Sequence, residues 1–190
     1  MMTMTQTADA TSTTTIWAID PTHSLVEFSA KHMMITSVKG RFTEVKGEIH
    51  MDETHPDRSY VTAELGVASI NTGVDQRDGH LRSADFLDAD THAGITFASK
   101  RIEGAVDRPG ETFKLVGDLT IKGITREIVL EAGYDGRGRD PWGGERVSFS
   151  ANGKIDRRDF GLTWNQALET GGILVGNEIK IAIEVQAVRA

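Results

Sequence analysis

The chain has 190 residues, a formal net charge of −7 and no cysteine. This length suits one all-β domain with room for a substantial core. The acidic balance argues against nucleic acid or an anionic membrane surface as the main partner, because both require a basic footprint. A local basic patch is compatible with this balance, but the arginine pair Arg157-Arg158 is interpreted as a solvated turn. The lack of cysteine excludes disulfides, thiol chemistry and cysteine-based zinc sites.

Residues 1–15 are polar and contain neither Lys nor Arg nor a long apolar run. A secretory signal needs both a basic start and an apolar segment, so we expect a disordered polar tail on a cytoplasmic protein. An exported protein is expected instead if a signal has been removed ahead of this sequence. Nowhere does the chain approach the apolar length of a membrane span, so no stable membrane insertion is expected. Residues 16–190 are predicted to form the folded domain.

From residue 24 onward, apolar and polar residues alternate with a period of two, which is typical of strands with one dry face. The predicted strands cover 24–32, 45–51, 61–67, 95–99, 112–121, 126–132, 146–155 and 177–185. Residues 135–138 (DGRG) are read as a turn between two of them. About eight such strands in series predict an antiparallel sandwich or barrel. Residues 74–93 are expected to form one or two short helices, and residues 157–173 an irregular loop.

Small residues recur among the large ones on the dry faces: Gly47, Ala63, Ser99, Gly117, Ala151 and Gly153. Such residues either fit the taper and bulges of a barrel or leave room for a ligand. A barrel of about eight strands has an interior that can just hold one small ligand. The pattern therefore permits a cavity, and both interpretations stay open.

Six histidines raise the question of metal binding or catalysis, but none stands in H-E-x-x-H spacing. His32 lies on the dry face of its strand, where a hydrogen-bonded core role is the simpler interpretation. Ser24 beside His23 lacks the G-x-S-x-G elbow of a nucleophilic serine, and adjacent strand residues face opposite ways. The sequence predicts no metal, no cofactor and no catalytic residue.

The polar stretch 77–86 (RDGHLRSADF) allows two interpretations. It is either a solvated helix held by local pairs such as Asp78 with Arg82 at i,i+4, or a lid over one mouth of the barrel. In the second case Arg77 and His80 would bind a polar head group, while Leu81 and Phe86 would cover the apolar interior.

The sequence resembles the YceI family of lipocalin-like, polyisoprenoid-binding proteins. Residues 20–32 (DPTHSLVEFSAKH) match the family pattern D-x-x-H-S-x-V-x-F-x-x-x-H, and further pieces follow in the family's order. These pieces are 40–42 (GRF), 47–49 (GEI), 69–72 (SINT), 77–87 (RDGHLRSADFL), 95–99 (ITFAS), 117–125 (GDLTIKGIT), 158–162 (RDFGL) and 175–179 (VGNEI). The resemblance covers residues 16–188. It implies an all-β, extended eight-stranded antiparallel barrel, a homodimer, and a long isoprenoid or other amphiphile bound along the lumen.

The expected function is therefore that of a carrier, store or sequestering protein for a long-chain apolar ligand such as a polyisoprenoid, an isoprenoid quinone or a fatty amphiphile. Its predicted ligand-binding residues are His23, Val26, Phe28, His32, Phe42, Ile49, Leu65, Arg77, His80, Leu81, Phe86, Phe97, Leu119, Ile121 and Phe149. Burial alone discriminates poorly between long chains, so we expect selection at the mouth near residues 77–86. The alternatives are an enzyme that uses the histidines with Asp and Arg as acid–base groups, and a solid barrel that binds a protein partner through an exposed apolar patch.

Overall fold

The structure is a computed structural model that describes residues 14–190 except 107 and 170. The described residues form eleven strands, one α-helix and three 3₁₀ helices. The strands are β1 (Thr14–Ile19), β2 (Leu25–His32), β3 (Thr36–Phe42), β4 (Val45–Asp52), β5 (Tyr60–Gly66), β6 (Ile70–Asn71), β7 (Gly94–Glu103), β8 (Thr112–Ile121), β9 (Ile124–Arg139), β10 (Glu145–Asp156) and β11 (Val175–Arg189). The helices are α1 (Asp75–Arg82), η1 (Pro56–Arg58), η2 (Val67–Ser69) and η3 (Arg157–Phe160).

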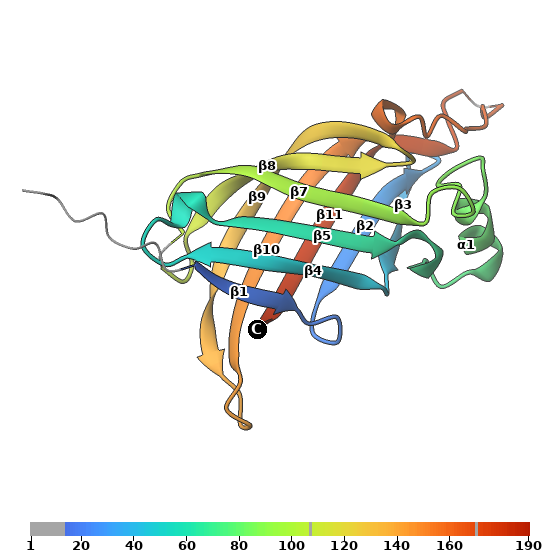
Figure 1. The fold of residues 1–190 in the computed structure, drawn as a ribbon. Coiled ribbons are helices and arrows are strands. Elements are labelled where there is room, and N and C mark those ends of the chain that lie inside the picture. The colour runs from blue at the N-terminus through green and yellow to red at the C-terminus, as the bar shows by residue number, and fades with distance from the viewer. Residues whose placement is uncertain (1–13, 107, 170) are drawn as a thin grey trace, which may run out of the picture.

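Eight of these strands form a closed antiparallel ring in the order β1-β4-β5-β7-β8-β9-β10-β11, which closes where β1 pairs with β11 (Figure 1). The remaining strands β2, β3 and β6 extend the sheet from the edge of β11 that also pairs with β1, but along a different part of that edge. Strand β11 can serve both neighbours because Val175–Glu184 pairs with β2, whereas 187–189 pairs with β1. The predicted all-β, eight-stranded antiparallel barrel is confirmed, although β2 lies outside the closed ring and β1 takes its place.

Strand β1 begins inside the segment that the sequence assigned to the polar tail. Thr15, Trp17 and Ile19 are buried while the residues between them are exposed, which is the alternation of a strand with one dry face. The indole Nε1 of Trp17 donates to Thr15 Oγ1 at 2.9 Å. Thr14 and Thr15 therefore belong to the barrel. The rest of the predicted tail, residues 1–13, lies outside the described residues.

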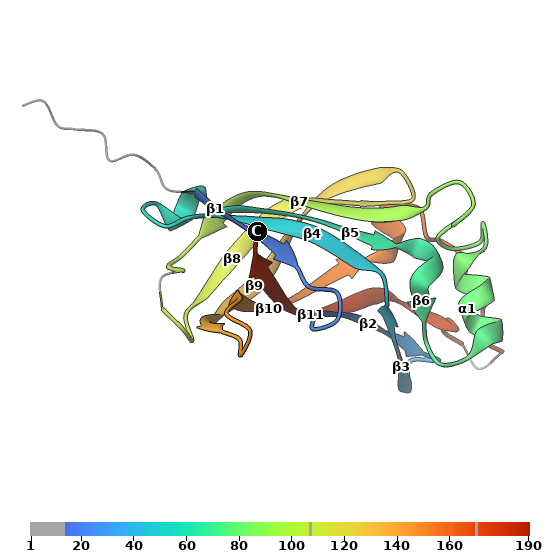
Figure 2. The same ribbon diagram turned by 60° about the horizontal axis from the view of Figure 1, so that its bottom comes forward.

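The two ends of the barrel differ in what covers them (Figure 2). At one end, called here the η1 end, β4 passes to β5 through η1. At the other, called the α1 end, lie β6, α1 and the irregular segment 161–174, which is described except for residue 170. The predicted helical stretch 74–93 contains the single helix α1, and the predicted loop 157–173 begins with η3. No helix in the described part of the chain is long and apolar enough to cross a membrane.

Arg157 is not the solvated residue that the sequence suggested, because its side chain is 2% exposed. Its guanidinium donates to four backbone carbonyls, of which those of Leu162 (2.6 Å), Trp164 (2.8 Å) and Gly176 (3.1 Å) are the nearest. Burial lowers the pKa of this arginine. Because irregular segments leave carbonyls unpaired, a fork of five donors can tie the segment 161–174 to the start of β11.

Candidate ligand-binding cavity

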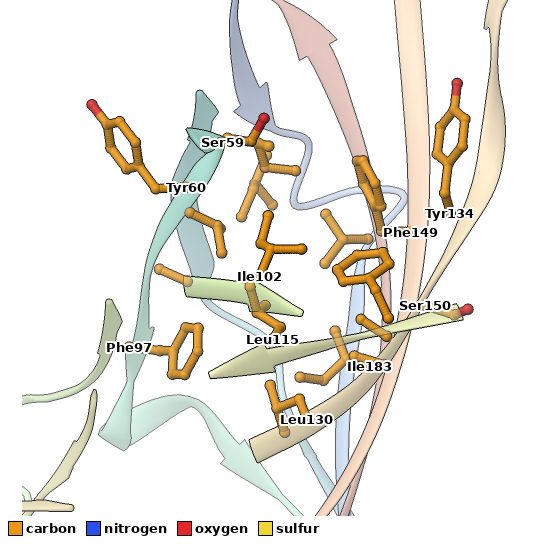
Figure 3. Close-up of a pocket in the computed structure, with 18 of the residues that line it drawn as sticks. Ser59, Tyr60, Phe97, Ile102, Leu115, Leu130, Tyr134, Phe149, Ser150 and Ile183 are labelled. Atoms are coloured by element: carbon orange, nitrogen blue, oxygen red, sulfur yellow. The ribbon is translucent and has the colours of Figure 1, made fainter. Parts of the chain in front are cut away.

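The barrel encloses a cavity of about 400 Å³ that extends inward from the η1 end. Every strand of the ring contributes apolar side chains to its wall, and β2 contributes Val26. In Figure 3 the side chains of Ile102, Leu115 and Phe149 converge on this space, and the hydroxyl group of Tyr134 points away from it. A volume of this size lies within the range of small-molecule pockets.

The alternation of the strands creates this wall. On β11, Ile181, Ile183 and Val185 line the cavity, whereas Lys180 and Glu184 between and beside them are exposed. Successive side chains of a strand point to opposite faces, so an apolar residue at every second position lines one side continuously. The cavity wall is thus encoded by the same pattern that predicted the strands.

Polar residues gather where the cavity reaches the η1 end. Asp52, Glu53, Ser59, Tyr60 and Arg137 all border it there. The Arg137 guanidinium contacts the Glu53 carboxylate at 3.3 and 3.4 Å, which is a loose ion pair between two exposed side chains. The buried carboxylate of Asp52 accepts hydrogen bonds from the backbone N–H groups of residues 54 and 55. This set, called here the mouth, offers both donors and acceptors to a polar head group.

A packed apolar cluster closes the cavity toward the α1 end. Its buried members include Phe42, Ile70, Leu87, Phe160 and Leu162. Wall residues such as Leu65 and Leu119 contact both this cluster and the cavity. The interior is therefore a pocket that opens at one polar mouth and is closed at its inner end by this apolar cluster.

The small inward residues divide between the two interpretations that the sequence left open. Ala63 and Ala151 line the cavity. At Gly117, a Cβ would lie 2.6 Å from the ring of Phe97, and at Gly153 it would meet the Leu130 side chain. These two glycines therefore make room for neighbouring side chains, and only the alanines leave space for a guest.

The structure divides the predicted apolar site residues into two groups. Six of them line the cavity: Val26, Ile49, Leu65, Phe97, Leu119 and Phe149. Five others lie outside the cavity lining, toward the α1 end: Phe28, Phe42, Leu81, Phe86 and Ile121. The rings of Phe28 and Phe42 pack with 5.7 Å between their centroids, which shows why inward position alone does not place a residue at the pocket.

Three of the four predicted polar residues are held by local side-chain contacts, and none of the four borders the cavity. His23 is 59% exposed and contacts Asp20 at 2.8 Å in the loop before β2. Arg77 donates to the hydroxyl and carbonyl oxygens of Thr72. His80 contacts Asp85 at 3.0 Å and packs against two aromatic rings. His32 ends β2, where it lies opposite residue 175 of β11.

These positions do not bring His23 and His32 together, as the enzyme hypothesis required. His23 precedes β2 and His32 ends it, and nine residues of extended chain span about 30 Å. The predicted ion pair in α1 is replaced by other contacts. Arg82 donates to the carbonyls of Ala68 and Ile70, and Asp78 accepts from Thr72.

Sequence reasoning missed the residues of the mouth. Arg137 lies in the DGRG stretch that was read as a turn, whereas β9 continues through it to Arg139. A register shift in the pairing of β9 with β10 and a positive φ of 132° at Gly136 absorb the extra residue as a β-bulge. The strong turn signal of the two glycines therefore concealed a strand. The only signal in the sequence for this position of Arg137 was that it stands within an apolar–polar alternation that continues along the strand.

Comparison with known proteins agrees with this architecture. A family model described as the YceI-like domain matches residues 17–187. A UPF0312 protein of Staphylococcus aureus (strain MSSA476) is 37% identical over 167 residues, which cover 87% of this chain and 93% of that protein. Among solved structures, a YCEI protein of Campylobacter jejuni superposes with a TM-score of 0.69 at 33% identity, covering 84% of this chain and 90% of the other.

A more distant structural neighbour shows how far the fold extends. A polyisoprenoid binding domain from Saccharophagus degradans superposes with a TM-score of 0.68, covering 92% of this chain and 98% of that domain. Its identity of 14% supports a shared fold alone. The family match, by contrast, spans nearly all of the described barrel, including every strand that lines the cavity. The chain therefore belongs to the YceI-like family.

Proposed function

We propose that the protein binds the apolar chain of one amphiphile inside the barrel and serves as its carrier, store or sequestering protein. The observation that carries this proposal is the blind apolar cavity of about 400 Å³ with a polar mouth at one end. An amphiphile fits such a site with its chain along the wall and its head group at the mouth. Family membership and the name of the S. degradans neighbour support an isoprenoid or similar chain as the class of ligand.

The volume of the cavity limits the length of chain that it encloses. A methylene group occupies about the volume of a water molecule, roughly 30 Å³, so 400 Å³ holds about a dozen carbon atoms. A longer isoprenoid would leave its remaining units outside the mouth, or would have to displace the apolar cluster at the α1 end. We therefore expect the site to grip one end of a long ligand, or the whole of a short one.

Extraction of the purified protein with organic solvent, followed by mass spectrometry, should reveal a bound amphiphile. Uptake of a fluorescent apolar probe, N-phenyl-naphthylamine, then locates the site with two neighbouring substitutions on β5. Ala63→Leu fills part of the cavity and should weaken probe binding by about tenfold or more, because the leucine displaces the guest. Thr62→Leu places the same side chain on the outer face and should leave binding unchanged.

Equal effects of the two variants would contradict the proposal, since the probe would then bind outside the barrel. Absence of both extractable lipid and probe uptake would overturn it as well. Thermal unfolding of both variants provides the control for folding, because an inserted side chain can strain a wall even where space is available.

A further inference from the structure

The turn between β2 and β3 exposes three consecutive apolar side chains. Met33, Met34 and Ile35 are 41%, 60% and 74% exposed. The turn is closed by the Ile35 N–H, which donates to the His32 carbonyl at 3.0 Å, and its Met33 N–H donates to Leu174 at the α1 end. These three residues, called here the apolar tip, therefore lie at the end of the barrel away from the mouth (Figure 1).

The backbone of the apolar tip is unfavourable for the residues that occupy it. Met33 and Met34 both have positive φ, at 52° and 60°. Hairpin turns with positive φ at both central residues strongly favour Asn-Gly, because other side chains are strained in the left-handed region. The two methionines give no core packing in return, since they are exposed. The two methionines are therefore unfavourable for the backbone conformation of this turn, and their side chains fill no part of the interior.

Three lysines lie behind the apolar tip on the outer face of the sheet. Lys39 of β3 and Lys180 of β11 both lie opposite Ser29 of β2 in the strand register, and Lys31 is two residues nearer the tip on β2. Strand spacing places Lys39 and Lys180 about 10 Å apart. Among the described residues, none of these three lysines forms an ion pair.

Two acids of the same face have basic neighbours of their own. Glu178 pairs with Lys154 at 3.4 Å, and Glu27 lies opposite Arg41 in the register of β2 and β3. A local excess of positive charge therefore stands on a chain whose net charge is −7. The whole-chain charge argues against a membrane as the main partner, but an exposed surface acts through its local field within a Debye length of about 8 Å.

We propose that the apolar tip and its three lysines dock the protein reversibly on an anionic lipid bilayer. Apolar side chains at an interface are buried about 5–10 Å into the boundary between head groups and acyl chains. Lys31 then lies about 7 Å behind Met33 along its strand, at the level of the lipid phosphates. Each lysine near an anionic surface strengthens association by about fivefold. This surface is separate from the cavity mouth, so docking and ligand binding can be tested independently.

The test is cosedimentation of the full-length protein, without added ligand, with vesicles of phosphatidylglycerol mixed with phosphatidylcholine. The protein should bind these vesicles and should not bind pure phosphatidylcholine. The double variant Met33→Asn/Met34→Gly supplies the residues that the turn prefers, so it should unfold at the same or a higher temperature and yet bind about tenfold more weakly or worse. Lys39→Gln/Lys180→Gln should weaken binding by about twenty-fivefold, in line with two lost lysines.

Two matched controls belong to the experiment. Trp142→Asn removes an exposed aromatic residue from the β9–β10 hairpin, and Lys46→Gln/Lys114→Gln removes two lysines from other strands. Neither control should change binding. Failure of the wild-type protein to bind anionic vesicles would overturn the proposal, as would binding by the Asn-Gly variant at wild-type strength. Equal binding to neutral vesicles would also overturn the proposal. So would a lipid-free dimer of the wild type that the Asn-Gly variant no longer forms, because the partner of the apolar tip would then be a second copy of the chain.

Discussion

The guanidinium carbon of Arg137 lies 5.1 Å from the centre of the Trp17 indole ring. The arginine belongs to β9 and the tryptophan to β1, two strands that are not paired in the ring. The contact therefore crosses the barrel at the mouth, where Arg137 also meets Glu53. The indole of Trp17 is fully buried, and the guanidinium of Arg137 lies over it. This contact holds the one positive charge of the mouth in a fixed position.

Substitution of Arg137 should reveal this anchoring role. We expect Arg137→Ala to lower the free energy of unfolding by about 1 kcal/mol, the sum of the cation–π contact of a partly exposed arginine and a weak ion pair. Urea denaturation measures this change. Arg139→Ala, two residues further on, removes an exposed arginine paired with Glu145 and should cost less. An equal loss in both variants would mean that the stacking on Trp17 contributes nothing.

Arg157 should be far more important for stability than its neighbour. Arg157→Met leaves buried carbonyls without donors, so we expect a loss of about 3 kcal/mol or more in the free energy of unfolding. Arg158→Met removes an exposed side chain that is paired with Asp156, and should change stability by less than about 1 kcal/mol. Chemical denaturation of the two variants decides the matter. If their stabilities agree, the segment 161–174 is held by other contacts.

The loop before β2 should make stability depend on acid pH. Hydrogen bonds from the Thr22 hydroxyl and from Arg146 hold the pKa of Asp20 well below its usual value of 3.8. A depressed pKa favours the ionised form in the folded state, so Asp20 stabilises the fold above about pH 4. That contribution is lost as the pH falls through the pKa of the folded state.

Asp20→Asn removes this dependence. At neutral pH the variant should be less stable than the wild type by about 2 kcal/mol, as for a lost hydrogen bond to a charged partner. The difference should shrink as the pH falls below about 4, because the unfolded wild-type carboxylate becomes protonated first and the folded one only at a still lower pH. Thermal or urea unfolding across this pH range tests the expectation. A difference that stays constant down to the lowest pH would show that the charge of Asp20 is not the cause.

The alternation of β4, β5 and β7–β11 made the barrel and most of its cavity wall predictable. Where a strand carries apolar residues at every second position, as at Ile181 and Ile183, the inward face follows from the pattern alone. Strand β3 escaped prediction because it has few apolar residues, and one of its inward positions is Gly40. A Cβ there would overlap the ring of Phe28 on β2. That requirement is visible only once the two strands are paired.

The mouth could not be found from the sequence for a different reason. Glu53 and Arg137 stand far apart in the chain, and neither lies in a recognisable motif. The stretch 77–87, one of the pieces that match the family, lies at the other end of the barrel. There its side chains hold α1 and the preceding loop together, as Arg77 does through Thr72. In this chain, a segment that matches the family pattern well therefore does not have to lie next to the cavity.

The most direct test of the account is a titration of the ligand-free protein with straight-chain primary alcohols from hexanol to octadecanol, followed by calorimetry. If the chain enters the blind cavity, affinity should rise by about fourfold for each added methylene. The rise should stop at about a dozen carbon atoms, where the cavity of about 400 Å³ is full. Affinity that does not depend on chain length would contradict the central claim that the barrel interior is the binding site.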